Sequence, residues 1–213
     1  VAQENTASIK VLEKLKMKLF YFEVIAFISG VVNIYLITRS SLWNWLFGII
    51  TVLLYSLIFF STKLYADMGL QGVFLAFQFY GLYQWQYGSS ARKPLSIQVM
   101  SQSTYFPVFI SAIILFTAIS FILKQYTDST TVYADACVTA LSLIAQWMMS
   151  KKYLHHWLLW IGIDILSIGL YLSKSLYLTS LLYSIFMLLC VKGYHDWKKN
   201  RVKSANEWSH SIA

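Results

Sequence analysis

Charge is scarce in this sequence. Charged residues make up 12% of the 213 residues, whereas hydrophobic residues make up 58%. Soluble proteins carry about 25% charged and about 45 to 50% apolar residues, so a chain of this composition could not cover its surface with polar groups in water. Seven helices of about 20 residues would use most of the apolar residues. The composition therefore excludes a soluble domain and predicts a chain whose solvent is the lipid bilayer.

Cysteine and the signature motifs of enzymes are also scarce. The two cysteines, Cys137 and Cys190, lie in separate apolar runs without CxxC or histidine spacing, which argues against a disulfide framework and a zinc site. A phosphate loop, G-x-S-x-G, H-E-x-x-H and a haem motif are all missing. His155 and His156 are interpreted as residues at the lipid headgroups, not as metal ligands. We therefore expect a protein that is not an enzyme and that needs no cofactor and no metal ion.

Basic residues outnumber acidic ones and give a formal net charge of +8. They are spread over both ends and the short loops instead of lining one groove, so nucleic acid is not the expected partner. Anionic lipid headgroups fit this distribution better.

Seven apolar runs are each long enough to cross a bilayer as a helix. They lie at about 20–38, 42–60, 69–87, 105–123, 131–149, 155–173 and 176–195. The sequence thus predicts an all-α membrane protein with seven transmembrane helices. Residues 1–19 precede them as an amphipathic segment, with leucines and lysines at helical spacing, that is expected to lie on the membrane surface. Residues 198–213 follow as a basic tail.

The sequence repeats itself at a distance of 112 residues. The pairs in this register include Trp45 with Trp157, Gly81 with Gly193, Trp85 with Trp197, and the acids Glu23 with Asp135. The repeat relates a three-helix unit at 20–87 to another at 131–197 and leaves 88–130 as a loop and linker helix. Because four helices separate equivalent elements, the two units are predicted to run in the same direction about an axis along the membrane normal, with substrate held near the midplane between them.

The number of basic residues on each side of the membrane differs only slightly, so it gives a weak indication of the orientation of the chain. An odd number of helices places the two ends on opposite sides of the membrane. Nine basic residues share the side of the C-terminal tail, namely Arg39, Arg92, Lys93, Lys151, Lys152, Lys198, Lys199, Arg201 and Lys203. Seven lie on the other side, namely Lys10, Lys14, Lys16, Lys18, Lys63, Lys124 and Lys174. By the positive-inside rule, this count favours a cytoplasmic C-terminus.

The most informative stretch is 155–171, HHWLLWIGIDILSIGLY. Trp157, Trp160, Asp164 and Tyr171 are spaced so that they share one face of a helix. An ionised carboxylate inside a span is costly unless it is paired, and no Lys or Arg lies in the middle of a span to pair with Asp164. A carboxylate beside two indole rings suits a flat cationic solute. Alternatively, Asp164 is protonated or bonded to a neighbouring helix, and the tryptophans form an interfacial belt.

Further polar residues lie inside or near the spans. Gln78 offers a donor and an acceptor to a ligand, and Thr51 and Tyr183 are also candidate substrate contacts, although all three could instead join helices. Weaker candidates are Trp45, Tyr171, and the acids Glu23 and Asp135, which could equally be solvated at the headgroups.

The stretch around Asp164 resembles the Pnu family of bacterial vitamin-precursor transporters. The residues that carry the resemblance are WLLWIGIDILSIGLY, SLYLTSLLY and GYHDW in the second half, and LFGIITVLLYSLIFF, LYADMGLQ and YGLYQW in the first. The resemblance covers nearly the whole chain from residue 20 onward. The family motif W-x-x-W-x-x-x-N/D falls on Trp157, Trp160 and Asp164, which implies that these residues bind the vitamin.

The resemblance also implies a fold, a mechanism and a substrate class. The family is similar in plan to full-length SWEET sugar transporters, with three helices, a linking helix and three more. Its members reside in the bacterial cytoplasmic membrane and work by facilitated diffusion, after which a cytoplasmic kinase traps the product by phosphorylation. The substrate is nicotinamide riboside in the PnuC type and thiamine in the PnuT type. Asn is usual at the positions of Asp164 and Thr51 in the PnuC type, so the acid favours thiamine.

Two other function classes stay open. A SWEET-like sugar carrier shares the plan but needs no buried acid beside an aromatic pair. A seven-helix photoreceptor would hold retinal on a lysine of its last helix, where Lys192 is the only candidate and lies near the helix end. The sequence also leaves open whether the protein forms a homo-oligomer and whether transport is coupled to protons.

Overall fold

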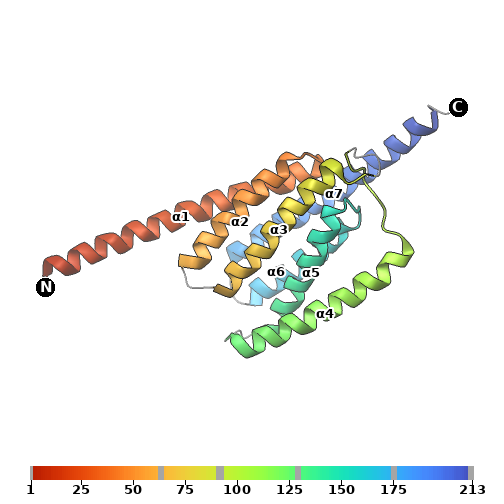
Figure 1. Cartoon of the computed structure of the whole chain (residues 1–213). Coiled ribbons are helices and arrows are strands. Elements are labelled where there is room, and N and C mark those ends of the chain that lie inside the picture. The colour runs from red at the N-terminus through yellow and green to blue at the C-terminus, as the bar shows by residue number, and fades with distance from the viewer. Residues whose placement is uncertain (1, 62–64, 90–93, 128–130, 174–176, 211–213) are drawn as a thin grey trace.

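Seven helices make up almost all of the structure (Figure 1). The computed structural model describes residues 2–61, 65–89, 94–127, 131–173 and 177–210. The helices are α1 (Ala2–Thr38), α2 (Trp43–Ser61), α3 (Tyr65–Tyr87), α4 (Gln102–Tyr126), α5 (Val132–Ser150), α6 (His156–Ser173) and α7 (Tyr177–His210). Among the described residues, the only β pairing is an isolated bridge between Gln98 and Tyr153, which joins the segments before α4 and α6. The predicted all-α class is therefore confirmed.

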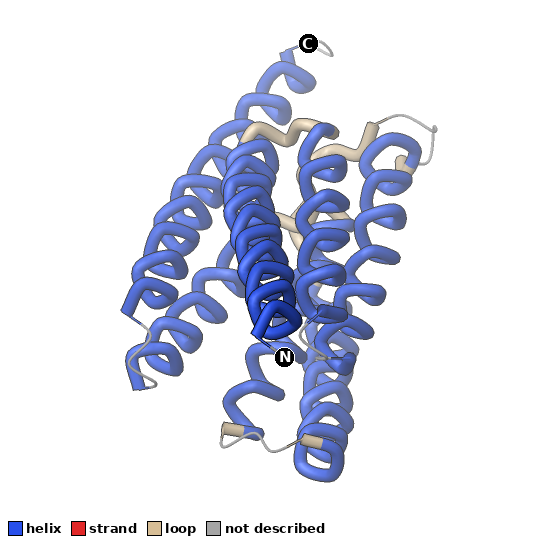
Figure 2. The backbone as a smooth tube through the Cα atoms, turned by 90° about the vertical axis from the view of Figure 1, so that its left-hand side faces the viewer, coloured by secondary structure: helices blue, strands red, loops and turns tan. Residues whose placement is uncertain are grey.

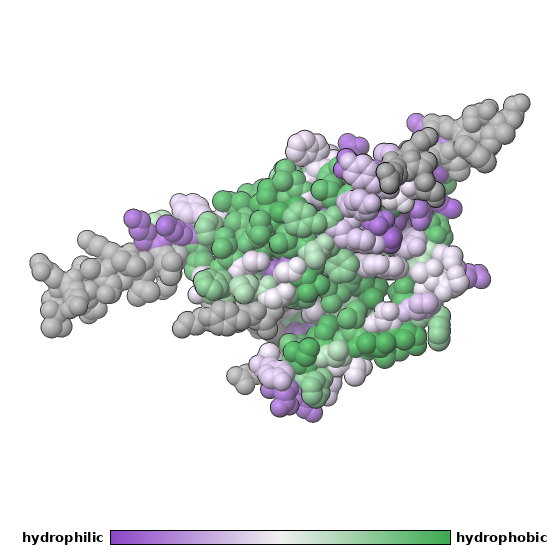
Figure 3. Space-filling model, viewed as in Figure 1, coloured by the Kyte–Doolittle hydropathy of each residue, from purple (hydrophilic) through white to green (hydrophobic). Residues whose placement is uncertain are grey.

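Five of these helices have segments long and apolar enough to cross a membrane, judged on the described residues by length and composition. The segments are Met17–Thr38, Trp43–Ser61, Gln102–Tyr126, Val132–Ser150 and His156–Ser173. Hydrophobic surface covers the middle of the helices, and hydrophilic residues gather toward the two ends of the bundle (Figure 3). Large apolar side chains such as Phe106 and Phe121 are exposed, as expected where lipid is the solvent.

The first and last helices are longer than their predicted spans. Helix α1 runs without a break from Ala2 through the segment that was expected to lie apart on the membrane surface, and α7 continues through most of the basic tail. Each extends beyond the bundle, at opposite ends (Figure 1). The residues Lys63, Arg92, Lys93 and Lys174, which entered the charge count, lie outside the described residues.

The helices pack in two groups. Helix α2 packs against α1 and α3, and α6 packs against α5 and α7. The groups meet where α1 contacts α7 and where α3 contacts α5. The described residues of α4 contact α5 alone among the other helices, and Figure 1 shows α4 at the edge of the bundle. The helices run roughly alongside one another (Figure 2).

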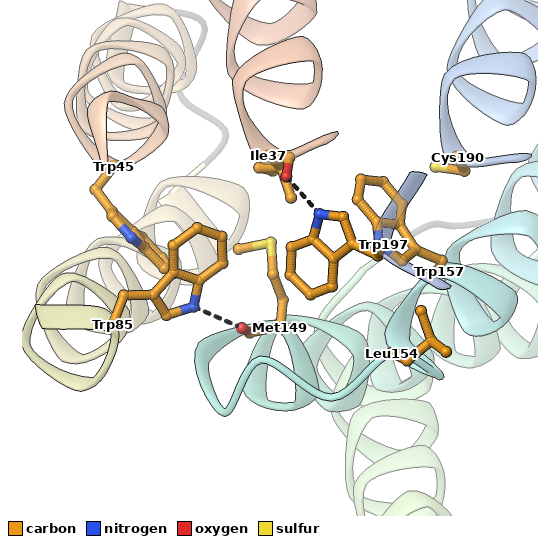
Figure 4. Packing of buried hydrophobic residues seen from close by; sticks show 8 residues of the cluster. All are labelled: Ile37, Trp45, Trp85, Met149, Leu154, Trp157, Cys190 and Trp197. Carbon is orange, nitrogen blue, oxygen red and sulfur yellow. Dashed lines mark hydrogen bonds between the residues drawn. The ribbon is translucent and has the colours of Figure 1, made fainter. Parts of the chain in front are cut away.

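Four buried tryptophans pack together near the ends of α1, α3 and α5 and the starts of α2 and α6 (Figure 4). This tryptophan cluster consists of Trp45, Trp85, Trp157 and Trp197, each at most 1% exposed. The ring centroids of Trp45 and Trp85 lie 5.3 Å apart, those of Trp85 and Trp197 5.7 Å apart, and those of Trp197 and Trp157 5.6 Å apart. Because Ile37 and Met149, near the ends of α1 and α5, pack against the same rings, α1, α3, α5 and α7 all point toward this cluster and α2 and α6 point away from it.

Residues 112 positions apart make matching contacts in this cluster. The Trp85 indole N–H donates to the carbonyl of Met149 at 3.0 Å, and the Trp197 indole N–H donates to that of Ile37 at 2.9 Å. Both donors and acceptors are related by the 112-residue shift, and each bond joins one helix group to the other. Just before α2 and α6, Ser40 and Lys152 share a positive φ, 52° and 57°. These pairs support the predicted parallel repeat.

Two glycines make room for the tryptophan rings. A Cβ at Gly81 would lie 1.9 Å from the Trp45 ring, and a Cβ at Gly193 would lie 2.5 Å from the Trp157 ring. These distances are far below a van der Waals contact, so only glycine fits at either position. The Trp–Gly contacts are themselves 112 residues apart, which explains why both residue types recur in the sequence repeat.

Candidate functional site

A cavity of about 540 Å³ lies directly beside the tryptophan cluster. Ile37, Met149 and Cys190 line the cavity and also pack in the same buried group as the four tryptophans, so the cavity adjoins the tryptophan cluster. Every helix except α4 contributes lining residues. The volume falls within the range of about 300 to 1,000 Å³ that is usual for small-molecule sites.

Asp164 supplies the acidic group of the cavity. It lies in the middle of the 18-residue helix α6 and is 3% exposed. The thiol of Cys190 on α7 donates a hydrogen bond to its carboxyl group, while the other carboxyl oxygen, Oδ2, has no partner among the described residues. None of the described residues that line the cavity is a Lys, Arg or His. The cavity therefore offers a buried acid without a protein cation beside it.

Four amide side chains line the cavity, namely Asn33 from α1, Gln71 and Gln78 from α3, and Gln146 from α5. Asn33 donates from Nδ2 to the carbonyl of Asn44 at 2.6 Å. Gln78 and Gln146 are 7% and 6% exposed. The Gln78 oxygen and the Gln146 nitrogen have no hydrogen-bond partner among the described residues, so together they leave one acceptor and one donor for a bound molecule.

Gly48 makes room for the amide groups. A Cβ at this position would lie 2.4 Å from the Gln78 Oε1 atom and 2.7 Å from the Asn33 Nδ2 atom. Because no larger residue fits without displacing both amides, the glycine in α2 fixes the shape of the cavity on this side.

Aromatic side chains provide most of the remaining polar lining. Trp160 on α6, Tyr55 on α2 and the pair Tyr171 and Tyr183 all face the cavity, and the two tyrosine rings of that pair lie 5.1 Å apart. Thr51 also lines the cavity, but its hydroxyl donates to the carbonyl of Phe47 in its own helix at 2.8 Å. Thr51 can therefore act toward a solute only as an acceptor.

Six of the candidates from the sequence line this one cavity, namely Thr51, Gln78, Trp160, Asp164, Tyr171 and Tyr183. Trp157 and Trp45 do not line it, because both are packed into the tryptophan cluster over Gly193 and Gly81. Trp157 shares a helix face with Asp164 but stands two turns nearer the start of α6. A shared face does not imply a shared depth along the helix.

The acids Glu23 and Asp135 do not line the cavity. Glu23 is exposed on α1. Asp135, in the first turn of α5, accepts a hydrogen bond from the Thr131 hydroxyl at 2.8 Å. That contact is typical of a carboxylate at a helix N-terminus, and neither acid is among the lining residues.

Sequence reasoning overlooked three lining residues, Asn33, Gln146 and Tyr55. The two amides lie deep within apolar runs, as Gln78 does, and a buried amide in a membrane helix requires a partner. The same signal that identified Gln78 was thus present for both. Tyr55 carried no such signal, because tyrosine is common throughout the chain.

Among the residues that the structure describes, the one buried lysine or arginine lies at the tryptophan cluster and not in the cavity. Lys152, in the loop between α5 and α6, donates from Nζ to the Leu95 carbonyl at 2.8 Å and stands 4.5 Å from the centre of the Trp85 ring. Both contacts stabilise the charged form, whereas burial acts against it and lowers the pKa of Lys152 to about 8. Lys192, the candidate retinal lysine, is half exposed and paired with Asp196.

Comparison with known proteins places the chain among bacterial transporters. The model of the family described as "Nicotinamide mononucleotide transporter" matches residues 20–199. The nicotinamide riboside transporter PnuC of Escherichia coli is 28% identical over 215 aligned positions, covering 89% of this chain and 88% of that protein. PnuC of Neisseria mucosa is 27% identical, covering 82% of this chain and 71% of that protein.

Two further similarities extend this result. The riboflavin/roseoflavin transporter RibM of Streptomyces davaonensis is 22% identical, covering 84% of this chain and 85% of that protein. A crystal structure of the vitamin B3 transporter PnuC superposes with a TM-score of 0.67 at 23% identity, covering 90% of this chain and 86% of that chain. The structural match supports the same fold.

Proposed function

The chain belongs to the nicotinamide mononucleotide transporter family, and from this membership we propose that it carries a flat cationic vitamin by facilitated diffusion. The family and the fold are those of a transporter of the bacterial inner membrane, so the protein is not an enzyme. The proposed solute lies in the cavity, midway between the helices of residues 20–87 and those of residues 131–197.

The observation that carries this proposal is the unpaired Asp164. A carboxylate buried at membrane depth costs several kcal/mol unless a positive charge or hydrogen bonds compensate it. Its Oδ2 atom has no partner among the described residues, and the described lining of the cavity contains no basic residue. A cationic solute would supply the missing charge, whereas a sugar would leave the acid uncompensated.

The other lining residues suit a flat solute with one polar edge. The indole of Trp160 can stack on a cationic aromatic ring, which contributes about 0.5 to 2 kcal/mol. Gln78 and Gln146 offer an acceptor and a donor to a neutral edge such as a carboxamide or an aminopyrimidine. This combination supports a solute that is charged on one side and hydrogen-bonding on the other.

Nicotinamide riboside is the first candidate substrate, because it is the solute named for the PnuC relatives. Thiamine is the second candidate. The acid at position 164 favours it by the family resemblance, and this preference stays a prediction from the sequence. Both are flat aromatic cations, so the same contacts would serve either.

Facilitated diffusion needs a step that keeps the vitamin inside the cell. Phosphorylation by a cytoplasmic kinase would add about −1.5 to −2 charges at neutral pH. Asp164 would repel such a product from the cavity. The buried acid would therefore favour the free vitamin over its phosphate, which makes uptake effectively one-way.

Calorimetry on the purified protein tests this proposal. Solutions of nicotinamide riboside, thiamine, riboflavin and glucose are titrated into the wild type, Asp164→Asn and the control Asp135→Asn. Removing a charged partner should weaken binding of the two cations about 10- to 150-fold, while Asp135→Asn leaves it unchanged. Equal affinity of wild type and Asp164→Asn for both cations, or a preference for glucose, would overturn the proposal.

A further inference from the structure

A second cavity of about 510 Å³ separates α4 from α3. Its walls come from α3, α4 and α5, and the side chains are almost all apolar, among them Val73, Phe77, Val108, Leu115, Ile144 and Trp147. Only two hydroxyls, Thr104 and Ser111, interrupt this lining. The described residues of α4 and α3 do not pack against each other, so this groove is where direct contact between the two helices is missing.

A cation lies beyond one end of the groove. Lys151, the residue directly after α5, follows Ile144 and Trp147 at spacings of seven and four residues and continues their face of the helix. Its Nζ atom stands 5.3 Å from the centre of the Tyr80 ring. Tyr80 in turn follows Val73 and Phe77 on α3. Both walls of the groove therefore continue to one point, where a lysine and a phenol meet at the end of the bundle that carries the tryptophan cluster.

We infer that this groove binds one anionic phospholipid. One acyl chain lies between α3 and α4 against the apolar walls, and the headgroup phosphate lies at Lys151. The apolar lining offers no hydrogen-bond partners for the backbone of an extended protein segment inside a membrane, whereas an acyl chain needs none. The cation at the end of the groove complements an anionic headgroup and not a second apolar surface.

The bound lipid would hold α4 in place. Since α4 otherwise packs only on α5 among the described helices, an acyl chain in the groove supplies its contact with α3. The inference does not depend on the proposed vitamin, because the groove shares no lining residue with the cavity that contains Asp164.

Native mass spectrometry of protein released from vesicles of phosphatidylglycerol and phosphatidylcholine tests this inference. The wild type should retain one phosphatidylglycerol per chain. Lys151→Gln should reduce its affinity about fivefold, the effect of one basic residue at a membrane surface. Arg39→Gln is the matched control. Arg39 lies 112 positions before Lys151, and its guanidinium stands 5.8 Å from the centre of the Tyr35 ring. Neither of the two described cavities is lined by Arg39.

A second pair of variants tests the apolar part of the groove. Ser111→Phe fills the groove and should displace phosphatidylglycerol and phosphatidylcholine alike. Thr117→Phe, on α4 but outside the lining, should leave lipid binding unchanged. Lipid retention by Lys151→Gln equal to that of the wild type would overturn the inference. So would a change in the number of chains in the complex on Ser111→Phe without loss of lipid, since the groove would then be an interface between copies. Vitamin titration of each variant reports separately on the proposed function.

Discussion

The tryptophan cluster and the cavity are built on the same repeat, but only one of them is symmetric. In the cluster, positions 112 apart hold the same residue: Trp45 and Trp157, Gly81 and Gly193, Trp85 and Trp197. Where both members of such a pair line the cavity beside it, they differ, as in Gly48 and Trp160, Val52 and Asp164, Gln78 and Cys190, and Ile34 and Gln146. The change from identity to difference takes place within two helical turns.

This difference separates packing from binding. Two like halves that close against each other make the same contacts twice, so the same residues serve both. A small solute with one charged end has no such symmetry, and its site needs an acid on one side and amides on the other. In a chain built from a repeat, identity between the halves therefore indicates packing, and divergence inside the cavity indicates the solute.

Removing one tryptophan of the cluster should have the largest effect. Trp85→Ala and Trp197→Ala each delete a buried ring and its hydrogen bond across the groups. We expect each to lower the free energy of unfolding by about 3 to 5 kcal/mol, measured by thermal unfolding in lipid nanodiscs. If one variant were stable and the other unfolded, the two tryptophans would not contribute equally to the free energy of unfolding.

Filling the space over the glycines should have the next largest effect. Gly81→Ala and Gly193→Ala place a methyl group against the Trp45 and Trp157 rings and should each cost about 1 to 3 kcal/mol of unfolding free energy. Gly162→Ala and Gly169→Ala are the controls, because a Cβ there meets nothing within 4 Å. Equal melting temperatures for all four variants would contradict the close packing of the rings.

Trp157 and Trp160 should respond in opposite ways. Trp160→Leu removes the ring that lines the cavity and should weaken vitamin binding about 2- to 30-fold with little change in stability. Trp157→Leu should lower the melting temperature and leave the affinity of the folded protein unchanged. Calorimetry and thermal unfolding of both variants decide this. A loss of affinity in Trp157→Leu would place its ring in the site.

Lys152 is the charged residue at the tryptophan cluster that the repeat does not match, since its counterpart is Ser40. Its titration should have the smallest of these effects on stability. Burial lowers the pKa of Lys152 to about 8, below its value of about 10.5 in the unfolded chain. Between these values the unfolded state binds more protons, so stability should rise as the pH increases from about 8 to about 10.5. The difference between these two pKa values alone corresponds to about 3 kcal/mol. Because the Leu95 carbonyl and the Trp85 ring stabilise the charged form, we expect a smaller pH-dependent change, of about 1 kcal/mol. Comparing the pH dependence of unfolding in wild type and Lys152→Met isolates this contribution.

Hydropathy predicts most of the fold because the cost of an exposed backbone in lipid is so large. The predicted spans at 42–60, 131–149 and 155–173 differ by one residue at each end, or less, from Trp43–Ser61, Val132–Ser150 and His156–Ser173. The prediction is poorest for α1 and α7. An apolar run predicts only the part of a helix that lies in hydrocarbon. Both α1 and α7 continue beyond that part as hydrogen-bonded helix in polar sequence.

The candidate site was predictable where a residue is costly to bury. Asp164 and Gln78 were identified because a charge or an amide inside a span must have a partner or face a cavity. The depth of Trp157 was not predictable, because helical spacing gives the face but not which neighbouring rings fill the space. The role of Gly48 was equally hidden, since only the positions of Asn33 and Gln78 show what its missing side chain admits.

The two indole hydrogen bonds have a consequence for the speed of transport. Trp85 donates to α5 and Trp197 donates to α1, so a movement that parts the helix groups at this end breaks both bonds and separates the rings together. Because the two bonds join the same pair of helix groups, we expect both to break in one step when the groups part at this end. Residues that do not touch the solute would then affect the rate of transport.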